Sequence, residues 1–257
     1  MKAKTDFTSI IKQFEYHYDL RTVFGDFLSM TLCAVAPNPL TGVSHYEDEY
    51  LKVIEKYKLS PLRKEFPKLL GQLIFEMEER HDSSLGNDIL GEFYEQYIYR
   101  KGAAQFFTPP PICEFMARCQ GEKSENEKPL NILDPACGSG RMLLAASRTL
   151  GKDNHFYGID IDQQCAQMTA LNLFFNGLFK SEVIWGDALN ASNFNISYKI
   201  SFLPFGVFRI YEKENSLLWQ MQHNSIVRDV KTTSSSIEFN EKISQFLNSN
   251  NSQLQLF

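Results

Sequence analysis

The sequence predicts an α/β protein in which a Rossmann-like parallel sheet follows an all-α N-terminal domain. An apolar run at 130–133 leads into a glycine-rich turn, and a helical pattern at 141–150 leads out of it. Two further apolar runs, at 155–159 and 183–185, each precede an aspartate and are separated by a helical pattern. Strands that alternate with helices around a glycine turn are typical of a doubly wound sheet.

The N-terminal part is predicted to be helical because its apolar residues recur at intervals of three and four. Prolines and a glycine at 37–42, then Pro61 and Pro67, divide it. The inward-facing positions are Phe7, Ile10, Ile11 and Phe14, then Val23, Phe24, Phe27 and Leu28, then Leu69, Leu70, Leu73, Ile74 and Met77. We expect a helical domain over 1–104 and a sheet domain with a polar C-terminal tail over 105–257.

The composition, net charge and cysteine count exclude some classes of protein. The 257 residues are 43% hydrophobic and 13% aromatic, which is enough for a sizeable core. The net charge of −5 lacks the basic excess of a free nucleic-acid-binding module, so DNA contacts would need a local basic patch or a basic partner. Five cysteines without a C-x-x-C pair predict neither a zinc site nor a disulfide framework, and free thiols fit the cytoplasm. We expect no signal peptide and no membrane span.

The turn Asp134-Pro135-Ala136-Cys137-Gly138-Ser139-Gly140 carries most of the functional information. It departs from the dinucleotide fingerprint, because Leu143 stands where a third glycine is required, and no Gly-Lys-Ser/Thr of a P-loop follows. A carboxylate at the head of the turn would repel a pyrophosphate. Asp134 therefore favours a ligand with an ammonium group and no phosphate, such as S-adenosylmethionine. The alternative is an ordinary strand-to-helix turn that uses glycine for its geometry alone.

Aspartates follow three successive predicted strands. Asp160 lies 20 residues after Gly140, which is about the spacing at which a carboxylate at the tip of the second strand holds a ribose. Asp187 follows the third strand. Because the carboxyl ends of parallel strands line one crevice, Asp134, Asp160 and Asp187 are expected to converge there.

A stiff loop, Gln105-Phe106-Phe107-Thr108, precedes three prolines at 109–111. Proline pre-sets the backbone, so the loop loses little entropy on ordering. Thr108 is expected to cap a helix from Pro109 to about Cys119. Another helix is predicted over 89–99, with its start near Asp88. Without further context, a buried aromatic turn is favoured over a binding role for this loop.

In combination, the stretches 105–109 and 134–140 resemble the adenine-N6 DNA methyltransferases, most of all the modification subunit of type I restriction-modification systems. The phrase at 88–95 is similar to one found upstream in that family, and the resemblance covers roughly 88–189. It implies methylation of adenine in DNA with S-adenosylmethionine, in a cytoplasmic homo- or hetero-oligomer with a specificity subunit. A small-molecule or protein methyltransferase is an alternative, against which Gln-Phe-Phe-Thr-Pro argues.

The resemblance also implies roles for single residues. Gln105 to Thr108 would fold over the methionine end of the cofactor, beside the tight turn. Asp160 would hold the ribose, and Ile161 would pack on the adenine. The adenine amino group would donate to Asp187 near the Ala188 backbone. The complete expected cofactor set is Gln105, Phe106, Phe107, Thr108, Asp134, Ala136, Gly138, Ser139, Gly140, Arg141, Asp160, Ile161, Asp187 and Ala188.

The family's Asn-Pro-Pro-Tyr/Phe motif does not occur in this sequence. Its asparagine and a proline carbonyl accept hydrogen bonds from the target adenine, and its aromatic ring stacks on the flipped base. A predicted fourth strand ends at 200–205, so Pro204 and Phe205 are the candidate catalytic residues, with Phe202 in the place of the asparagine. Loss of one such acceptor costs about 10²–10³ in rate. A catalytically inactive adenosylmethionine-binding relative is therefore the alternative function.

Residues 206–257 are few for the remaining strands of a complete methyltransferase sheet. They contain one candidate strand at 207–211 and a short helix at 217–221. The rest is rich in Ser, Thr, Asn and Gln and is predicted to be partly disordered. The sheet is therefore predicted to be incomplete relative to the family.

Overall fold

The computed structural model describes residues 6–37, 43–80, 87–99, 107–121, 128–223 and 254–256. Its helices are α1 (Phe7–Ile11), α2 (Leu20–Ala34), α3 (Glu47–Glu55), α4 (Glu65–Glu79), α5 (Ile89–Phe93), α6 (Pro110–Cys119), α7 (Arg141–Leu150) and α8 (Gln163–Phe175). Its strands are β1 (Asn131–Asp134), β2 (His155–Asp160), β3 (Ser181–Asp187), β4 (Asn190–Phe202), β5 (Phe205–Ile210) and β6 (Leu254–Leu256). A π-helical turn (Tyr94–Ile98) extends α5, and a helical segment covers 217–223. Within the described ranges, no helix has the length and apolar character to cross a bilayer.

The strands form one mixed sheet in the order β5-β4-β3-β2-β1-β6. Strands β6, β1, β2 and β3 run parallel, so the aspartates that end β1, β2 and β3 lie along one edge. This confirms the predicted α/β fold with a Rossmann-like parallel sheet. Helix α7 connects β1 to β2, and helix α8 connects β2 to β3, so each crossover between these parallel strands contains one helix.

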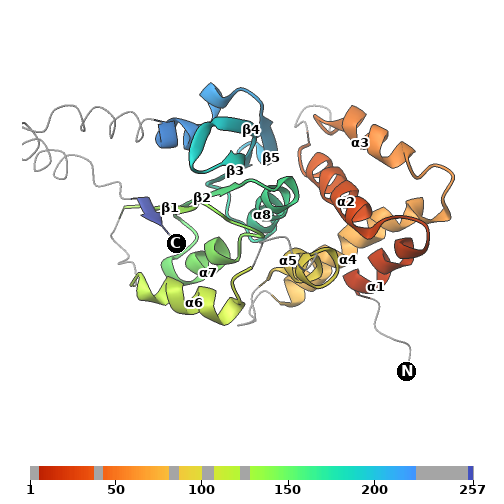
Figure 1. The fold of residues 1–257 in the computed structure, drawn as a ribbon, viewed down its shortest axis with the longest axis horizontal. Helices are drawn as coiled ribbons and strands as arrows, with labels where there is room; N and C mark the ends of the chain where they lie inside the picture. The colour runs from red at the N-terminus through yellow and green to blue at the C-terminus, as the bar shows by residue number, and fades with distance from the viewer. Residues whose placement is uncertain are drawn as a thin grey trace, which may run out of the picture.

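The main hydrophobic core extends from the N-terminal helices into the sheet without a break. It includes Phe7 in α1, Phe24 in α2, Leu171 in α8 and Val207 in β5. Helix α8 lies between the sheet and the N-terminal helices (Figure 1). The predicted boundary between 104 and 105 falls outside the described residues, so the division into two domains stays a prediction.

Two smaller clusters complete the packing. On the other face of the sheet, Tyr157, Ile159 and Ile184 pack against Leu218 of the 217–223 segment. Helix α6 is attached to α7 through a separate cluster of four residues, namely Cys113, Ala117, Met142 and Ala145. Phe115 of α6 lies outside this cluster and is 68% exposed.

Most predicted elements are present within two or three residues, but three details were wrong. Ile74 of α4 is 44% exposed rather than inward-facing. Thr108 does not cap α6, because Pro109 occupies the cap position and no side chain bonds to the helix end. The predicted fourth strand is not parallel: β4 runs antiparallel to β3. Only Ala188 and Leu189 separate β3 from β4, whereas a parallel return needs a crossover of about a dozen residues or more.

The β4–β5 hairpin is anchored on the N-terminal helices. The Val207 N–H donates to the Val35 carbonyl at 3.0 Å. The Arg209 guanidinium lies 4.4 Å from the Tyr46 ring centroid and pairs with Glu49. Gly206 lies at the closest approach, with φ of +146°, and a Cβ there would stand 2.5 Å from the Val35 oxygen. The sheet is thus held to α2 and α3 by backbone as well as side-chain contacts.

We predict that Gly206→Ala lowers the free energy of unfolding by roughly 2–3 kcal/mol, because the new methyl group adds backbone strain and displaces the hairpin from α2. Gly121→Ala is the matched control: φ there is +90°, and no atom lies within 4 Å of the place that a Cβ would occupy. The control should lose only about 1 kcal/mol. Urea denaturation followed by circular dichroism measures both, and equal losses would contradict the close approach at Val35.

Candidate functional site

The glycine loop, residues 134–140, joins β1 to α7 and shapes the site. Gly138 and Gly140 adopt positive φ angles of +54° and +86°, which side-chain-bearing residues rarely adopt. A Cβ at Gly138 would approach the Phe107 ring to 3.0 Å, and one at Gly140 would approach Thr169 to 3.1 Å. The glycines therefore allow the loop to lie directly against Phe107 on one side and α8 on the other.

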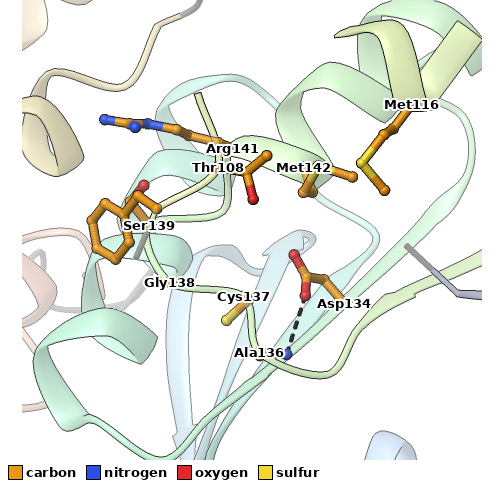
Figure 2. Close-up of a pocket in the computed structure, with 10 residues that line it drawn as sticks. Thr108, Met116, Asp134, Ala136, Cys137, Gly138, Ser139, Arg141 and Met142 are labelled. Atoms are coloured by element: carbon orange, nitrogen blue, oxygen red, sulfur yellow. Dashed lines mark hydrogen bonds between the residues drawn. The ribbon is translucent and has the colours of Figure 1, made fainter. Parts of the chain in front are cut away.

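Asp134 ends β1 and is 6% exposed. Its carboxylate accepts a hydrogen bond from the Ala136 N–H at 3.1 Å and faces the cavity (Figure 2). Burial raises the pKa of Asp134 from 3.8 to about 6, and the nearby charge of Asp160 adds to the rise. In the described part of the chain no basic side chain pairs with this carboxylate. Those residues therefore present a buried negative charge without a cation.

Asp160 ends β2 and fastens the glycine loop. One carboxylate oxygen accepts from the Gly138 N–H at 2.8 Å, and the other accepts from the Asp162 N–H at 2.8 Å. Burial raises the pKa of Asp160. Since each carboxylate oxygen can accept more than one hydrogen bond, Asp160 keeps acceptor capacity for ligand hydroxyl groups.

A cavity of about 260 Å³ opens between the glycine loop and the start of α6. This is slightly below the range of about 300–1,000 Å³ typical of small-molecule sites, and it suits a group the size of an amino acid. Figure 2 shows Met116 and Met142 beside Asp134 at one end and Ser139 and Arg141 at the other. The lining residues are Phe107, Thr108, Met116, Asp134, Ala136, Cys137, Gly138, Ser139, Arg141 and Met142.

Phe107 covers the loop from outside. Its ring stacks on Tyr94 with centroids 5.5 Å apart and an interplanar angle of 18°. The Arg141 guanidinium lies 5.5 Å from the same ring centroid. The segment that contains Phe107 and Thr108 is thus packed between the π-helical turn and the glycine loop, where both residues line the cavity.

Behind the loop, the buried carboxylate of Asp88 binds three segments. It accepts from the Ser139 hydroxyl at 2.5 Å and from the Arg141 Nε–H at 2.6 Å. It also accepts from the Asn172 amide of α8 at 2.7 Å and from the Gly91 N–H of α5 at 2.8 Å. Burial raises the pKa of Asp88, and the Arg141 charge opposes that rise. The sequence pattern indicated Asp88 only as the start of a helix.

The tip of β3 lies at the same edge but outside the residues that line the cavity. The Asp187 carboxylate accepts from the Leu189 N–H at 2.9 Å. The Ala188 carbonyl accepts from the Gln222 amide at 2.6 Å, which fixes this tip to the 217–223 segment. Ile161 is 68% exposed, and its carbonyl accepts from the Trp185 indole at 3.1 Å. The exposed Ile161 side chain leaves an apolar surface beside Asp160.

The structure separates the candidate catalytic residues from the cavity. Because β4 is antiparallel, Pro204 and Phe205 lie in the β4–β5 turn, at the opposite edge of the sheet from Asp134. Phe205 packs there against Phe174 and Phe179, at ring distances of 5.1 and 5.5 Å. The expected position of Pro204 and Phe205 beside the cofactor loop was therefore wrong. Two other expected site residues, Gln105 and Phe106, lie outside the described residues.

Five residues of the described site were not predicted as site residues, namely Asp88, Met116, Cys137, Met142 and Asn172. Asn172 could have been noticed as a polar residue inside the apolar run of α8. Met116 and Met142 carry no distinguishing signal, because methionines at helical spacing usually fill a core.

The fold and site define a class of protein. A glycine loop follows a parallel strand, and carboxylates end that strand and its neighbour, as in α/β proteins that bind a nucleoside-containing ligand. The buried carboxylate at the head of the loop favours a cationic ligand group over a phosphate.

Comparison with known proteins identifies the family. The family described as N-6 DNA Methylase matches residues 85–236, which is more than half of the chain. The chain belongs to this N-6 DNA methylase family. It is 30% identical over 135 residues to the type II restriction enzyme and methyltransferase RM.BcgI of Heyndrickxia coagulans, covering 46% of this chain and 21% of that protein.

One further curated relative and one solved structure complete the comparison. The chain is 29% identical over 113 residues to the type I restriction enzyme MpnII methylase subunit of Mycoplasma pneumoniae, covering 40% of this chain and 20% of that protein. A solved structure of a type I restriction-modification methyltransferase subunit from Streptococcus thermophilus aligns with a TM-score of 0.35 and 14% identity, covering 66% of this chain and 56% of that one. The chain spans about a fifth of the length of these curated relatives.

We predict that Asp134→Asn stabilises the protein at neutral pH. The carboxyl pKa is about 6 in the folded protein and 3.8 when unperturbed, so ionised Asp134 disfavours folding by at most about 3 kcal/mol above pH 6. As pH falls from 6 to below 4 the acid becomes protonated in both states, and the gain should vanish. Thermal unfolding of both proteins between pH 4 and 8 measures this difference. Asp153→Asn, whose side chain is 95% exposed, should show no comparable gain.

Proposed function

We propose that this chain is the S-adenosylmethionine-binding part of an adenine-N6 DNA methyltransferase of the type I modification-subunit kind. The observation that carries the proposal is the pair of carboxylates at the glycine loop, namely the buried Asp134 at its head and the partly buried Asp160, which accepts from the Gly138 N–H. They occur in a chain whose match to the N-6 DNA methylase family spans this loop.

The residues present fit the cofactor. Asp134 offers a buried carboxylate that no described cation neutralises, which suits the ammonium group and the neighbouring sulfonium. Asp160 has acceptor capacity for the two ribose hydroxyls, and the exposed Ile161 side chain gives an apolar surface for the adenine. Phe107 and Thr108 would enclose the methionine end. When bound, the cofactor supplies an activated methyl group on its sulfonium sulfur.

Methyl transfer also requires groups that hold the target adenine. Pro204 and Phe205 are at the opposite edge of the sheet and do not fit this role. Strand β6 lies beside β1 with its carboxyl end at the site edge, since Leu256 pairs with Leu133. We infer that the target base approaches on this β1–β6 side of Asp134, because the β3 side is covered by the 217–223 segment.

We further propose that the chain acts on DNA together with a specificity subunit, in the cytoplasm. A net charge of −5 gives the chain no overall attraction for DNA, so a partner would supply most phosphate contacts. The Mycoplasma pneumoniae relative is a methylase subunit of a type I restriction enzyme, which supports a multi-subunit assembly of homo- or hetero-oligomeric form.

Titration calorimetry with S-adenosylmethionine tests the proposed cofactor. We expect the wild-type protein to bind it, and Asp160→Ala to weaken binding at least about tenfold, because hydrogen bonds to a charged acceptor contribute about 1.5–3 kcal/mol each. Asp153→Ala, an exposed aspartate before β2, serves as the control and should bind like the wild type. A folded wild-type protein that fails to bind would refute the proposal.

A methyl-transfer assay tests the proposed reaction. We expect transfer of labelled methyl groups from S-adenosylmethionine to the N6 position of adenine in unmethylated DNA when a specificity subunit is added, and much less without it. Asp134→Asn should abolish transfer while leaving the protein folded. Cofactor binding without transfer under any of these conditions would instead support the non-enzymatic binding module.

A further inference from the structure

Arg141 is the cationic residue among the described side chains that line the cavity, and the anionic Asp134 lines the same cavity. Its guanidinium nevertheless points away from Asp134, toward the other end of the cavity (Figure 2). The Nε–H donates to Asp88 at 2.6 Å, and an Nη1–H donates to Glu95 at 3.0 Å. Arg141 is buried, so its direction is set by these two carboxylates and by the Phe107 ring.

Asp88 is held in its ionised form, and its negative charge neutralises Arg141. Its partners Gly91, Asn172 and Arg141 each present an N–H, which can only donate, so both carboxylate oxygens act as acceptors. Burial alone would lower the pKa of Arg141, but the charge of Asp88 and its hydrogen bond raise it. The pair is therefore an ion pair buried beneath the loop.

This pairing decides the charge that a ligand meets. With Arg141 neutralised and its guanidinium turned away from Asp134, the carboxylates of Asp134 and Asp160 dominate the electrostatic potential of the cavity. An uncompensated guanidinium in the cavity wall would oppose them, because its field is only weakly screened in a buried site. A ligand that carries a positive charge would lose affinity, whereas a neutral analogue of the same shape would lose little.

We propose that Asp88 is a positioning residue that sets the charge preference of the site: by holding Arg141 out of the cavity, it makes the site favour the cationic sulfonium of S-adenosylmethionine over the neutral thioether of S-adenosylhomocysteine. This inference rests on the proposed function. A merely structural ion pair would predict a different result, because a distorted loop weakens the binding of both ligands alike.

The test compares dissociation constants of both ligands by titration calorimetry. In Asp88→Asn the ratio of the S-adenosylmethionine constant to the S-adenosylhomocysteine constant should rise on the order of tenfold, because the site loses one buried negative charge and Arg141 keeps only Glu95 as its partner. The double variant Asp88→Asn/Arg141→Gln removes both charges and should return the ratio to the wild-type value. This recovery is expected even if both ligands bind more weakly.

Glu95 provides a variant that keeps the Asp88 network intact. Its side chain is 47% exposed, so Glu95→Gln should fold and should raise the ratio in the same direction by about threefold, reduced by solvent screening. Glu92→Gln is the matched control, because Glu92 lies on the same helical segment but pairs with Arg80 at 2.7 Å. The control should leave the ratio unchanged.

The outcomes separate the inference from the proposed function. An unchanged ratio in folded Asp88→Asn, or in Glu95→Gln if the former does not fold, would overturn the charge role of Asp88 alone. A wild-type protein that binds neither ligand would overturn both, and the wild-type titrations would show this before any variant is made.

Discussion

The four hydrogen bonds accepted by Asp88 join segments that are far apart in the sequence. They connect the start of α5, the glycine loop and the middle of α8 at one buried point. Helix α5 and the glycine loop approach each other so closely that a Cβ at Gly91 would stand 2.4 Å from the Ser139 hydroxyl oxygen. Because removal of one partner from a buried ion pair typically costs about 3–5 kcal/mol, the conformation of the loop depends on this single carboxylate.

The electrostatic design of the site follows from its burial. The carboxylates of Asp134 and Asp160 end parallel strands in a region that disfavours their ionised forms, as their raised pKa values show. Such charges reduce the stability of the free protein and become favourable only when a cation or hydroxyl donors arrive. The fold therefore tolerates local instability where binding occurs, and the extensive core shared by helices and sheet offsets it.

Local patterns in the sequence were sufficient to locate the parallel half of the sheet. The strand–glycine–helix order and the three aspartates correctly located the edge at which β1, β2 and β3 end, because each depends on residues near in sequence. The direction of β4 was not predicted, although the two-residue connection after Asp187 is too short for a parallel return. The role of Asp88 was also missed, because its partners Ser139 and Asn172 lie 51 and 84 residues away from it in the chain.

The separate packing of α6 has a mechanical consequence. The α2–α8 packing, the β4–β5 hairpin contacts and the Asp88 network fix the helices and the sheet as one body. Helix α6, which carries Met116 in the cavity wall, is attached through the small Cys113 cluster. The main core contains no residue of α6. A tilt of α6 that widened the cavity would therefore disturb the Cys113 cluster and leave the main core intact.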